Sequence, residues 1–405
     1  MRRRIIKNKL LLLLLILVSQ VYSQPSLKAD AQAKISNDIR VGAERTDMYL
    51  SLIKNKSIAV VANQASLIKK MNLVDSLFTL GIKIKKVFSP EHGFRGDADA
   101  GEKVPNYKDP KTGIPVISLY GKKQKPLPAD LKDVDIVIYD LQDVGVRFYT
   151  YISTLHYIME ACAENKKQLI VLDRPNPNGH YVDGPVLEEK YKSFVGLHPV
   201  PIVYGMTPAE YAKMINGEGW LKGKVKCDLI FILVENYDHN DLYELPVKPS
   251  PNLPNMCAVY LYPSLALFEG TVVSVGRGTD MPFQVIGHPT LQNGKFTFTP
   301  KSNEGAKDPM YKGQACNGYD LRDFGNVYIK NNKNIYLFWL QGTYKDTPDK
   351  LTFFNDYFNN LVGNGTLKQQ IIDGVIEENI RKSWEPELKK FKEIRKKYLL
   401  YKDFN

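Results

Sequence analysis

Cysteine is scarce in this chain of 405 residues, which has four, at positions 162, 227, 257 and 316. No two of them form a Cys-x-x-Cys pair, and Cys162 and Cys227 lie inside apolar runs. This pattern excludes a fold held together mainly by disulfides. We expect buried free thiols, although an exported chain could join two of them.

Long apolar runs are also lacking, except near the N-terminus. Basic residues crowd the first nine positions, the apolar run Leu10–Val18 follows, and a small-residue cleavage pattern ends at Ser23, before Gln24. This order predicts a secretory signal peptide over residues 1–23. The run is too short for a spanning helix, which needs roughly 20 apolar residues. We therefore expect an exported protein, periplasmic or secreted, with no stable membrane span in the mature chain.

The formal charge of +11 belongs largely to the two ends of the chain. Without residues 1–23, 50 basic and 44 acidic residues remain, and residues 389–405 carry most of that excess. The part of the chain between these two ends is close to neutral, so nucleic acid is not an expected partner. A basic helical end is usually a solvated face, and binding of an anionic cell-surface polymer is the alternative.

Several sequence motifs of cofactor and metal chemistry are missing. The chain has no G-x-x-x-x-G-K-[ST] loop, no H-E-x-x-H pair and no G-x-S-x-G elbow. Gly276-Arg277-Gly278 lacks the third glycine of a dinucleotide fingerprint, and the six histidines show no ligand spacing. We therefore expect no cofactor and no metal, which leaves carboxylates as the working groups.

Short β-branched runs alternate with segments of helical period in the first half of the chain. Strands are predicted over residues 58–62, 82–88, 116–119, 134–141, 168–172, 201–204 and 225–234. Helices are predicted over 67–80, over 153–165 and from about 207. Such alternation predicts an α/β fold with a parallel sheet covered on both faces.

The pattern of predicted strands and helices changes after the proline-rich stretch 245–254, where we place a domain boundary. Beyond it, strands are predicted over 295–299 and 334–340, and helices over 350–361 and 375–398. The expected organisation is an α/β domain over residues 24–245 and a smaller α+β domain over residues 246–405.

Polar residues follow four of the predicted strands, at the edge where open α/β sheets bind ligands. Any one of them could be a helix cap or ordinary turn chemistry, but together they predict a functional rim. The candidates at this rim, besides the segment after the second strand, are Asn63, Asp140, Gln142, Asp143, Asp173, Arg174 and Asn176.

The segment Ser89–Gly96 is the strongest candidate for a functional loop. Pro90 fixes the exit from the strand and the glycines permit a tight turn, so the loop can hold Glu91 in a cleft as a general acid. His92 is a possible catalytic orienter. The competing interpretation is a solvated loop in which Glu91 pairs with Arg95.

Several ordered motifs resemble one known family. They lie at Ser89–Gly96, Asp140–Tyr151, Asp173–Pro177, Ser250–Pro254, Leu267–Thr271 and Val275–Asp280. These segments resemble the exo-acting β-N-acetylmuramidase family of glycoside hydrolases, long catalogued as a domain of unknown function. The resemblance extends from about Val41 to Tyr398 and shows no departure at these motifs.

The resemblance implies a Rossmann-like domain, a smaller second domain and an active site in the cleft between them. It also implies release of N-acetylmuramic acid from the non-reducing ends of peptidoglycan fragments, in cell-wall turnover or recycling, with Glu91 as a catalytic group. The alternatives are a non-catalytic exported peptidoglycan or sugar binding protein and a hydrolase of another cell-surface polymer.

Glycoside cleavage needs an acid and a second group that handles the positive charge at the anomeric carbon. Glu91 is the expected acid. The second group is Asp140, Asp143 or Glu269, or else the acetamide of the substrate, with Asp140 slightly favoured. Arginine suits the lactyl carboxylate of muramic acid, and the candidates for that contact are Arg147, Arg174 and Arg277.

Overall fold

The computed structural model describes residues 38–96, 98–99, 101–102, 104–327 and 332–404. The predicted signal peptide lies outside these residues. Within them, no helix combines the length and the apolar character that crossing a bilayer requires. All four cysteines are described, and all four are buried free thiols, as expected.

A seven-stranded sheet forms the centre of the first half of the chain. Its spatial order is β5 (Tyr107–Lys108), β6 (Pro115–Ser118), β4 (Lys83–Ser89), β1 (Ser57–Ala62), β7 (Ile136–Asp140), β8 (Gln168–Leu172) and β9 (Asp228–Ile232). Every pairing is parallel except that of the short edge strand β5 with β6. Without β5, the order is the 3-2-1-4-5-6 of a Rossmann sheet, whose ligand crevice lies where the order reverses.

Helices pack around this sheet, and their ends follow local sequence rules. They are α2 (Thr46–Ile53), α3 (Leu73–Thr79), α4 (Pro128–Leu131), α5 (Tyr151–Glu164) and α6 (Pro208–Glu218), with short 3-10 turns at Gly42–Glu44, Glu189–Tyr191 and Lys222–Lys224. At α6, Thr207 and Glu210 form a capping box, with Pro208 at the first helical position and Gly219 in the left-handed region after the last. The predicted start of this helix is confirmed.

Two predicted elements of the first half are wrong. Residues 67–72 form the hairpin β2 (Leu67–Ile68) and β3 (Met71–Asn72), and α3 begins only at Leu73, where the Asn72 side chain caps it. Residues 201–204 add no strand to the sheet, because Val203 makes only isolated bridges to Val146 and Asp183. Apolar content alone did not distinguish these loops from regular elements.

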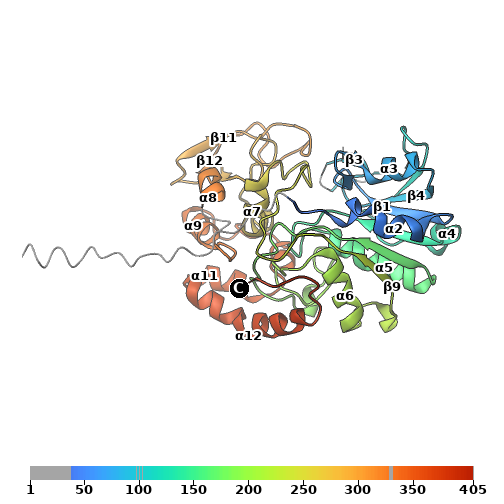
Figure 1. Cartoon of the computed structure of the whole chain (residues 1–405). Helices are drawn as coiled ribbons and strands as arrows, with labels where there is room; N and C mark the ends of the chain where they lie inside the picture. Colours follow the sequence, from blue (N-terminus) through green and yellow to red (C-terminus); the bar gives the residue numbers. More distant parts are fainter. Residues whose placement is uncertain (1–37, 97, 100, 103, 328–331, 405) are drawn as a thin grey trace, which may run out of the picture. The chain divides into compact units, whose positions relative to one another are not determined.

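The second half contains α7 (Met256–Leu265), a 3-10 turn (Ala266–Gly270) and a three-stranded antiparallel sheet in the order β10 (Val285–His288), β12 (Cys316–Asp320) and β11 (Phe296–Phe298). The helices α8 (Arg322–Val327), α9 (Phe338–Asp346), α10 (Phe358–Val362), α11 (Thr366–Ile372) and α12 (Glu377–Lys396) follow. The elements β11, β12, α8 and α9 lie on one side of α7, and β1, β4 and β9 lie on the other (Figure 1).

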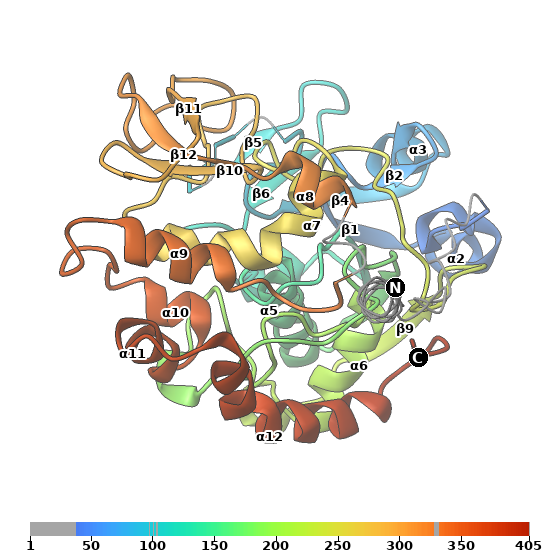
Figure 2. The ribbon, with the colours of Figure 1, turned by 90° about the vertical axis from the view of Figure 1, so that its left-hand side faces the viewer.

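The predictions for the second half are mixed. The strand over 295–299 and the helix over 375–398 are confirmed by β11 and α12. The strand over 334–340 is wrong, because α9 begins at Phe338, and only the end of the predicted helix 350–361 is helical, in α10. Helix α12 lies below α6 in both ribbon views (Figures 1 and 2).

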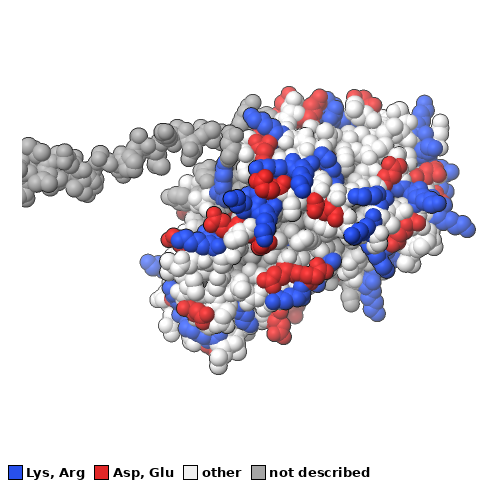
Figure 3. Space-filling model, turned by 90° about the horizontal axis from the view of Figure 1, so that it is seen from below, with Lys and Arg blue, Asp and Glu red and all other residues white. Residues whose placement is uncertain are grey.

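The basic C-terminal region carries many of its own counter-ions. Along α12, Lys382, Lys390 and Lys396 pair with glutamates three or four positions earlier, at 2.6–2.9 Å. On the face seen from below, acidic and basic side chains are interspersed (Figure 3). This arrangement favours the solvated face over a polymer-binding patch.

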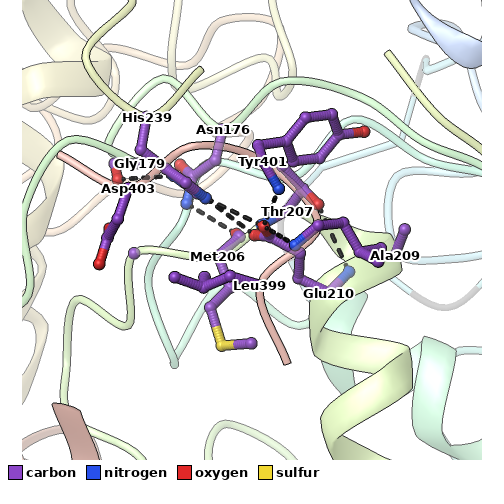
Figure 4. Close-up of polar contacts among 12 residues, drawn as sticks. Asn176, Gly179, Met206, Thr207, Ala209, Glu210, His239, Leu399, Tyr401 and Asp403 are labelled. Atoms are coloured by element: carbon purple, nitrogen blue, oxygen red, sulfur yellow. Dashed lines mark hydrogen bonds and ion pairs between the residues drawn. The ribbon is translucent and has the colours of Figure 1, made fainter. Parts of the chain in front are cut away.

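The chain ends by returning to the first half. The Glu210 carboxylate, at the N-terminus of α6, accepts the backbone N–H groups of Leu400 (2.8 Å) and Tyr401 (3.3 Å) and contacts His239 at 3.0 Å. His239 also contacts the carbonyl oxygen of Gly179 at 3.0 Å (Figure 4). Since Glu210 and His239 are fully buried, these contacts satisfy polar groups that would otherwise be costly to bury.

Candidate active site

Both halves of the chain contribute to one cavity of about 330 Å³. The first half supplies Glu91 and His92 after β4, the run Phe148–Tyr151 at the start of α5, and Tyr120. From the second half come Ser250, Asn252, Leu253, Tyr262, Glu269, Arg277, Phe283, Tyr357 and Leu361. Four predicted site residues, Glu91, His92, Glu269 and Arg277, therefore meet in one place.

Hydrogen bonds fix the carboxyl group of Glu91. The N–H of Gly101 donates to Oε1 over 3.0 Å, and the Thr150 hydroxyl donates to Oε2 over 3.2 Å. The Tyr120 hydroxyl is a further partner, and burial together with the negative charge of Glu91 raises the pKa of Tyr120 above its ordinary value. Glu91 thus faces the cavity in a defined orientation.

The loop around Glu91 is held from outside the cavity. Arg95 forms ion pairs with Asp75 (3.0 Å) and Asp109 (2.8 Å), and its guanidinium lies over the ring of Phe94. Gly96 has a positive φ of 81°, and a side chain there would collide with Gln64. Because Arg95 pairs with two aspartates on the far side of the loop, the structure does not support the alternative of a Glu91–Arg95 pair.

His92 joins the two halves beside Glu91. Its Nδ1 contacts the carbonyl oxygen of Ala98 at 3.0 Å, and its Nε2 contacts Ser250 Oγ at 3.1 Å. Burial lowers the pKa of His92 despite the opposing charge of Glu91, so we assign a neutral ring that donates from Nδ1 and accepts at Nε2. These contacts suit a positioning role for His92 in the loop that carries Glu91.

Glu269 and Arg277 form an ion pair on the cavity wall. Nε and one terminal nitrogen of the guanidinium donate to the same oxygen, Glu269 Oε1, at 3.0 and 2.7 Å. The guanidinium also lies 5.0 Å from the centre of the Phe283 ring. Because a guanidinium carries five N–H groups, this geometry leaves donors of Arg277 for an anion in the cavity.

Aromatic rings form much of the remaining wall. Tyr262 makes edge contacts with Phe148, Tyr149 and Phe283, with ring centroids 4.9–6.1 Å apart. The Tyr149 hydroxyl donates to the carbonyl oxygen of Pro249 over 2.9 Å, so it also ties this wall to the second half. Aromatic faces with a few convergent polar groups are typical of ligand pockets, and they suit a sugar ring.

The structure does not bring Asp140 and Arg174 to the cavity. They form a buried ion pair, with Nε to Oδ1 at 2.5 Å and a second contact at 3.0 Å, and Arg174 also donates to the carbonyl oxygen of Leu67. Both side chains are almost completely inaccessible to solvent. The preference for Asp140 as the second catalytic group is therefore corrected, and Glu269 is the candidate carboxylate that shares the cavity with Glu91.

We predict that Asp140→Asn lowers stability and leaves the chemical step intact. The substitution leaves Arg174 buried without its counter-ion, which typically costs about 3–5 kcal/mol. Denaturant unfolding measures that loss, and hydrolysis per folded molecule should match the parent. A fully folded variant without activity would return Asp140 to the mechanism.

Arg147 is likewise occupied away from the cavity. Its guanidinium donates to the carbonyl oxygens of Pro185, Val200, Leu361 and Val362, at 2.6–3.0 Å. Burial lowers its pKa to about 9. Since Leu361 and Val362 belong to α10, Arg147 fastens the two halves together, and the prediction that it binds a substrate carboxylate is corrected.

Gln142 and Asp143 are also buried in the turn after β7. Asp143 accepts hydrogen bonds from the Tyr204 hydroxyl and from the N–H of Gly145, and burial raises its pKa to about 6. Gln142 donates to the carbonyl oxygens of Asp143 and Pro175. Their contacts are structural, and neither lines the cavity.

Asn63, Asp173 and Asn176 support the fold around the cavity without lining it. Asn63 donates to the Tyr151 hydroxyl over 2.8 Å, so it stands behind one residue of the cavity wall. Asn176 donates to the carbonyl oxygen of Met206, and its side chain occupies the space where a side chain at position 145 would lie. Glycine is therefore required at that position, whose φ is 79°.

Asp173 should make stability depend on pH. It accepts hydrogen bonds from the N–H of Ala209 and the Tyr401 hydroxyl, and burial raises its pKa to about 7. Because the folded state then binds a proton that the unfolded state has lost, stability should fall as pH rises from about 4 to about 7. The loss should be on the order of 1 kcal/mol per pH unit. Unfolding of Asp173→Asn across this range should show a flatter profile than the parent; parallel profiles would contradict the assignment.

Sequence reasoning did not single out several cavity residues. The motif Asp140–Tyr151 contains the cavity residues Tyr149, Thr150 and Tyr151, and the motif Ser250–Pro254 contains Ser250 and Asn252. The sequence did not predict any of these five as a site residue. Their presence in those motifs was the available signal. Tyr120, Phe194 and Tyr357 lie outside all the quoted motifs, so no signal pointed to them.

Among the residues that the structure describes, no group of three or more His, Cys, Asp or Glu side chains is placed to hold a metal ion. The polar side chains that line the cavity carry carboxyls, hydroxyls, one carboxamide, one imidazole and one guanidinium.

A Rossmann-like domain, a smaller second domain and a cavity lined by two glutamates, together with the family match, assign the chain to the α/β glycosidases. The match to family models is specific. This chain belongs to the exo-β-N-acetylmuramidase NamZ family, whose N-terminal model matches residues 58–257 and whose C-terminal model matches residues 260–401. The predicted family is confirmed, while the domain boundary at residues 245–246 stays a prediction.

Known proteins agree with this assignment. The chain is 39% identical over 388 residues to the peptidoglycan β-N-acetylmuramidase NamZ of Bacillus subtilis (strain 168), covering 87% of this chain and 89% of that one. Crystal structures of two DUF1343 family proteins from Bacteroides fragilis NCTC 9343 are similar, with TM-scores of 0.84 and 0.75 and identities of 45% and 28%. Each covers 90% of this chain and 99% of its own. The predicted fold class is confirmed.

Proposed function

We propose that this protein is an exo-acting β-N-acetylmuramidase that releases N-acetylmuramic acid from the non-reducing ends of peptidoglycan fragments. The observation that carries the proposal is that Glu91 and the Glu269–Arg277 pair line one cavity of about 330 Å³. That volume is at the small end of ligand pockets and suits a single sugar. The membership of the chain in the NamZ family supports the same reaction.

Glu91 is the general acid that protonates the leaving glycosidic oxygen. Its Oε1 accepts from a backbone N–H, which can only donate, whereas its Oε2 faces the Thr150 hydroxyl, which can donate or accept. Oε2 is therefore the oxygen that can carry the acid proton without losing its hydrogen bond. Transfer of that proton breaks the C–O bond as the leaving sugar departs.

Glu269 faces the positive charge that develops at the anomeric carbon. Arg277 binds its Oε1, so Oε2 is the oxygen available to the sugar. Glu269 acts there as a nucleophile, as a base for water or as an electrostatic partner of the substrate acetamide. Stereochemical analysis of the first-formed product distinguishes retention from inversion.

Arg277 binds the lactyl carboxylate of the muramic acid. It lines the cavity, keeps donors beyond those used by Glu269, and presents the planar fork that suits a carboxylate. This contact would select muramic acid over N-acetylglucosamine, which has no lactyl group.

The deciding experiment is incubation with a disaccharide that carries N-acetylmuramic acid at its non-reducing end, followed by mass analysis. Free N-acetylmuramic acid and N-acetylglucosamine are the expected products. Binding without turnover would favour a non-catalytic receptor. Turnover of another cell-surface polymer, with the muramide untouched, would favour a different hydrolase.

We also propose that the protein is exported and then acts in the periplasm or outside the cell. The support is the basic, apolar and small-residue order of residues 1–23. N-terminal sequencing of the protein from its native cells should begin at Gln24, and fractionation should recover it outside the cytoplasm. An intact Met1 on the cytoplasmic protein would overturn the proposal.

A further inference from the structure

A second cavity, of about 600 Å³, meets the first one at Glu269 and Arg277, which line both. Its other walls come from two loops. Asp99, Gly101 and Glu102 belong to the loop that follows Glu91, and the segment Gly305–Met310 belongs to the second half. The Glu269–Arg277 pair therefore belongs to the wall of both cavities and lies between them.

Direct contacts hold the two loops together. The Asp99 carboxylate accepts the N–H groups of Gly305 (2.9 Å) and Lys307 (2.8 Å), and the Lys307 ammonium pairs with Glu102 at 2.8 Å. In the same loop, Gly101 donates to Glu91. The wall of the second cavity is thus continuous with the backbone that orients the proposed acid.

The position of Glu91 indicates which part of a substrate enters the second cavity. A general acid must reach the glycosidic oxygen, which lies between the released sugar and the leaving sugar. The smaller cavity, with its aromatic wall, takes the terminal sugar. Since the hydrogen bond from Gly101 places Glu91 next to the larger cavity, the leaving part extends in that direction.

We propose that the second cavity is the binding site for the leaving saccharide, beginning with its N-acetylglucosamine. The inference rests on the proposed function. Asp308 is 93% exposed and has only a long contact with the Lys312 ammonium, at 3.9 Å, so it offers a polar group to that saccharide. Met310, which is 44% exposed, offers an apolar surface. At about 600 Å³, the cavity is large enough for more than the first leaving sugar.

The test compares substrates that differ only in their leaving group. For the parent and each variant, kcat/KM is measured on a nitrophenyl N-acetylmuraminide and on a tetrasaccharide with N-acetylmuramic acid at its non-reducing end. In Met310→Trp, which fills the cavity, and in Asp308→Ala, the ratio of tetrasaccharide to nitrophenyl rates should fall roughly tenfold. Glu304→Ala is the control, because Glu304 lies in the same loop but pairs with Lys248 outside the cavity.

The outcomes separate this inference from the proposed function. A parent enzyme that turns over no muramide contradicts the proposed function itself. If the parent is active and both variants keep the parental ratio, the proposed function stands and the leaving-group site is overturned. A tetrasaccharide preference that appears only when stem peptides are attached also overturns it, because the cavity would then bind peptide.

Discussion

Glu91→Gln is expected to reduce release of N-acetylmuramic acid by about 10² to 10⁴-fold, the usual contribution of general acid catalysis. The amide has nearly the shape of the carboxyl group but cannot deliver an acid proton. Its oxygen can accept the N–H of Gly101, and its nitrogen can donate to the Thr150 hydroxyl, so the loop should keep its conformation. Initial rates on the muramic-acid-terminated disaccharide measure the effect.

Glu304→Gln is the matched control for this substitution. Glu304 is exposed and pairs with Lys248, so the same chemical change there should leave the rate unaltered. Unfolding curves of the two variants should coincide with that of the parent. If Glu91→Gln retained activity within about threefold of the parent, Glu91 would have no part in proton transfer.

The second large effect concerns the lactyl carboxylate. A disaccharide with N-acetylglucosamine at its non-reducing end should be a poor substrate, because the donors of Arg277 are then left without an anion. Losing one partner of a buried charged pair typically costs about 2–5 kcal/mol. The expected discrimination is therefore roughly 30-fold or more in kcat/KM. In Arg277→Ala the two disaccharides should become similar, since the group that distinguishes them is gone.

Measuring kcat/KM of the parent and of Arg277→Ala on both disaccharides forms a thermodynamic cycle. The cycle separates the contact between Arg277 and the lactyl carboxylate from the loss of the ion pair with Glu269. Arg322→Ala is the control, because Arg322 pairs with Asp320 at 2.6 Å on the surface, away from the cavity. Its discrimination should equal that of the parent. Comparable rates of the parent on the two disaccharides would remove Arg277 from recognition of the substrate.

The first half of the fold could be predicted from the sequence because its central strands are buried on both faces. Nearly every residue of β1, β7 and β8 is buried, and in β4 the last three residues are, so these apolar runs leave no period for a helix. The polar residues at the ends of the four strands mark those ends correctly. Which of these polar residues line the cavity and which hold the fold together could not be predicted. Asp140 is the last residue of a buried strand whichever role it has, and only the position of Arg174 shows that it is an ion-pair partner.

The roles of the arginines could not be predicted from local sequence either. Arg147 and Arg277 both lie in glycine-containing motifs that resemble the family, so local sequence treats them alike. Arg147 donates to the carbonyl groups of Leu361 and Val362, more than 200 residues later, whereas Arg277 pairs with Glu269, eight residues earlier. Contacts over such separations follow from packing and leave no local pattern.

In the second half, α9 was mistaken for a strand because Tyr336, Phe338 and Trp339 are rich in β-propensity. Their rings pack on one another and on Phe324, and this cluster outweighs the intrinsic preference. Packing of this kind depends on residues that a local window does not contain.

The returning C-terminal segment has a consequence for how the protein is made. Leu400 and Tyr401 complete the hydrogen bonding of Glu210 and Asp173, which lie in the part of the chain that is synthesised first. These hydrogen bonds of Glu210 and Asp173 can therefore form only after residues 400 and 401 have been synthesised. A chain without residues 400–405 would keep every residue that lines the cavity and would lose these partners of two buried carboxylates.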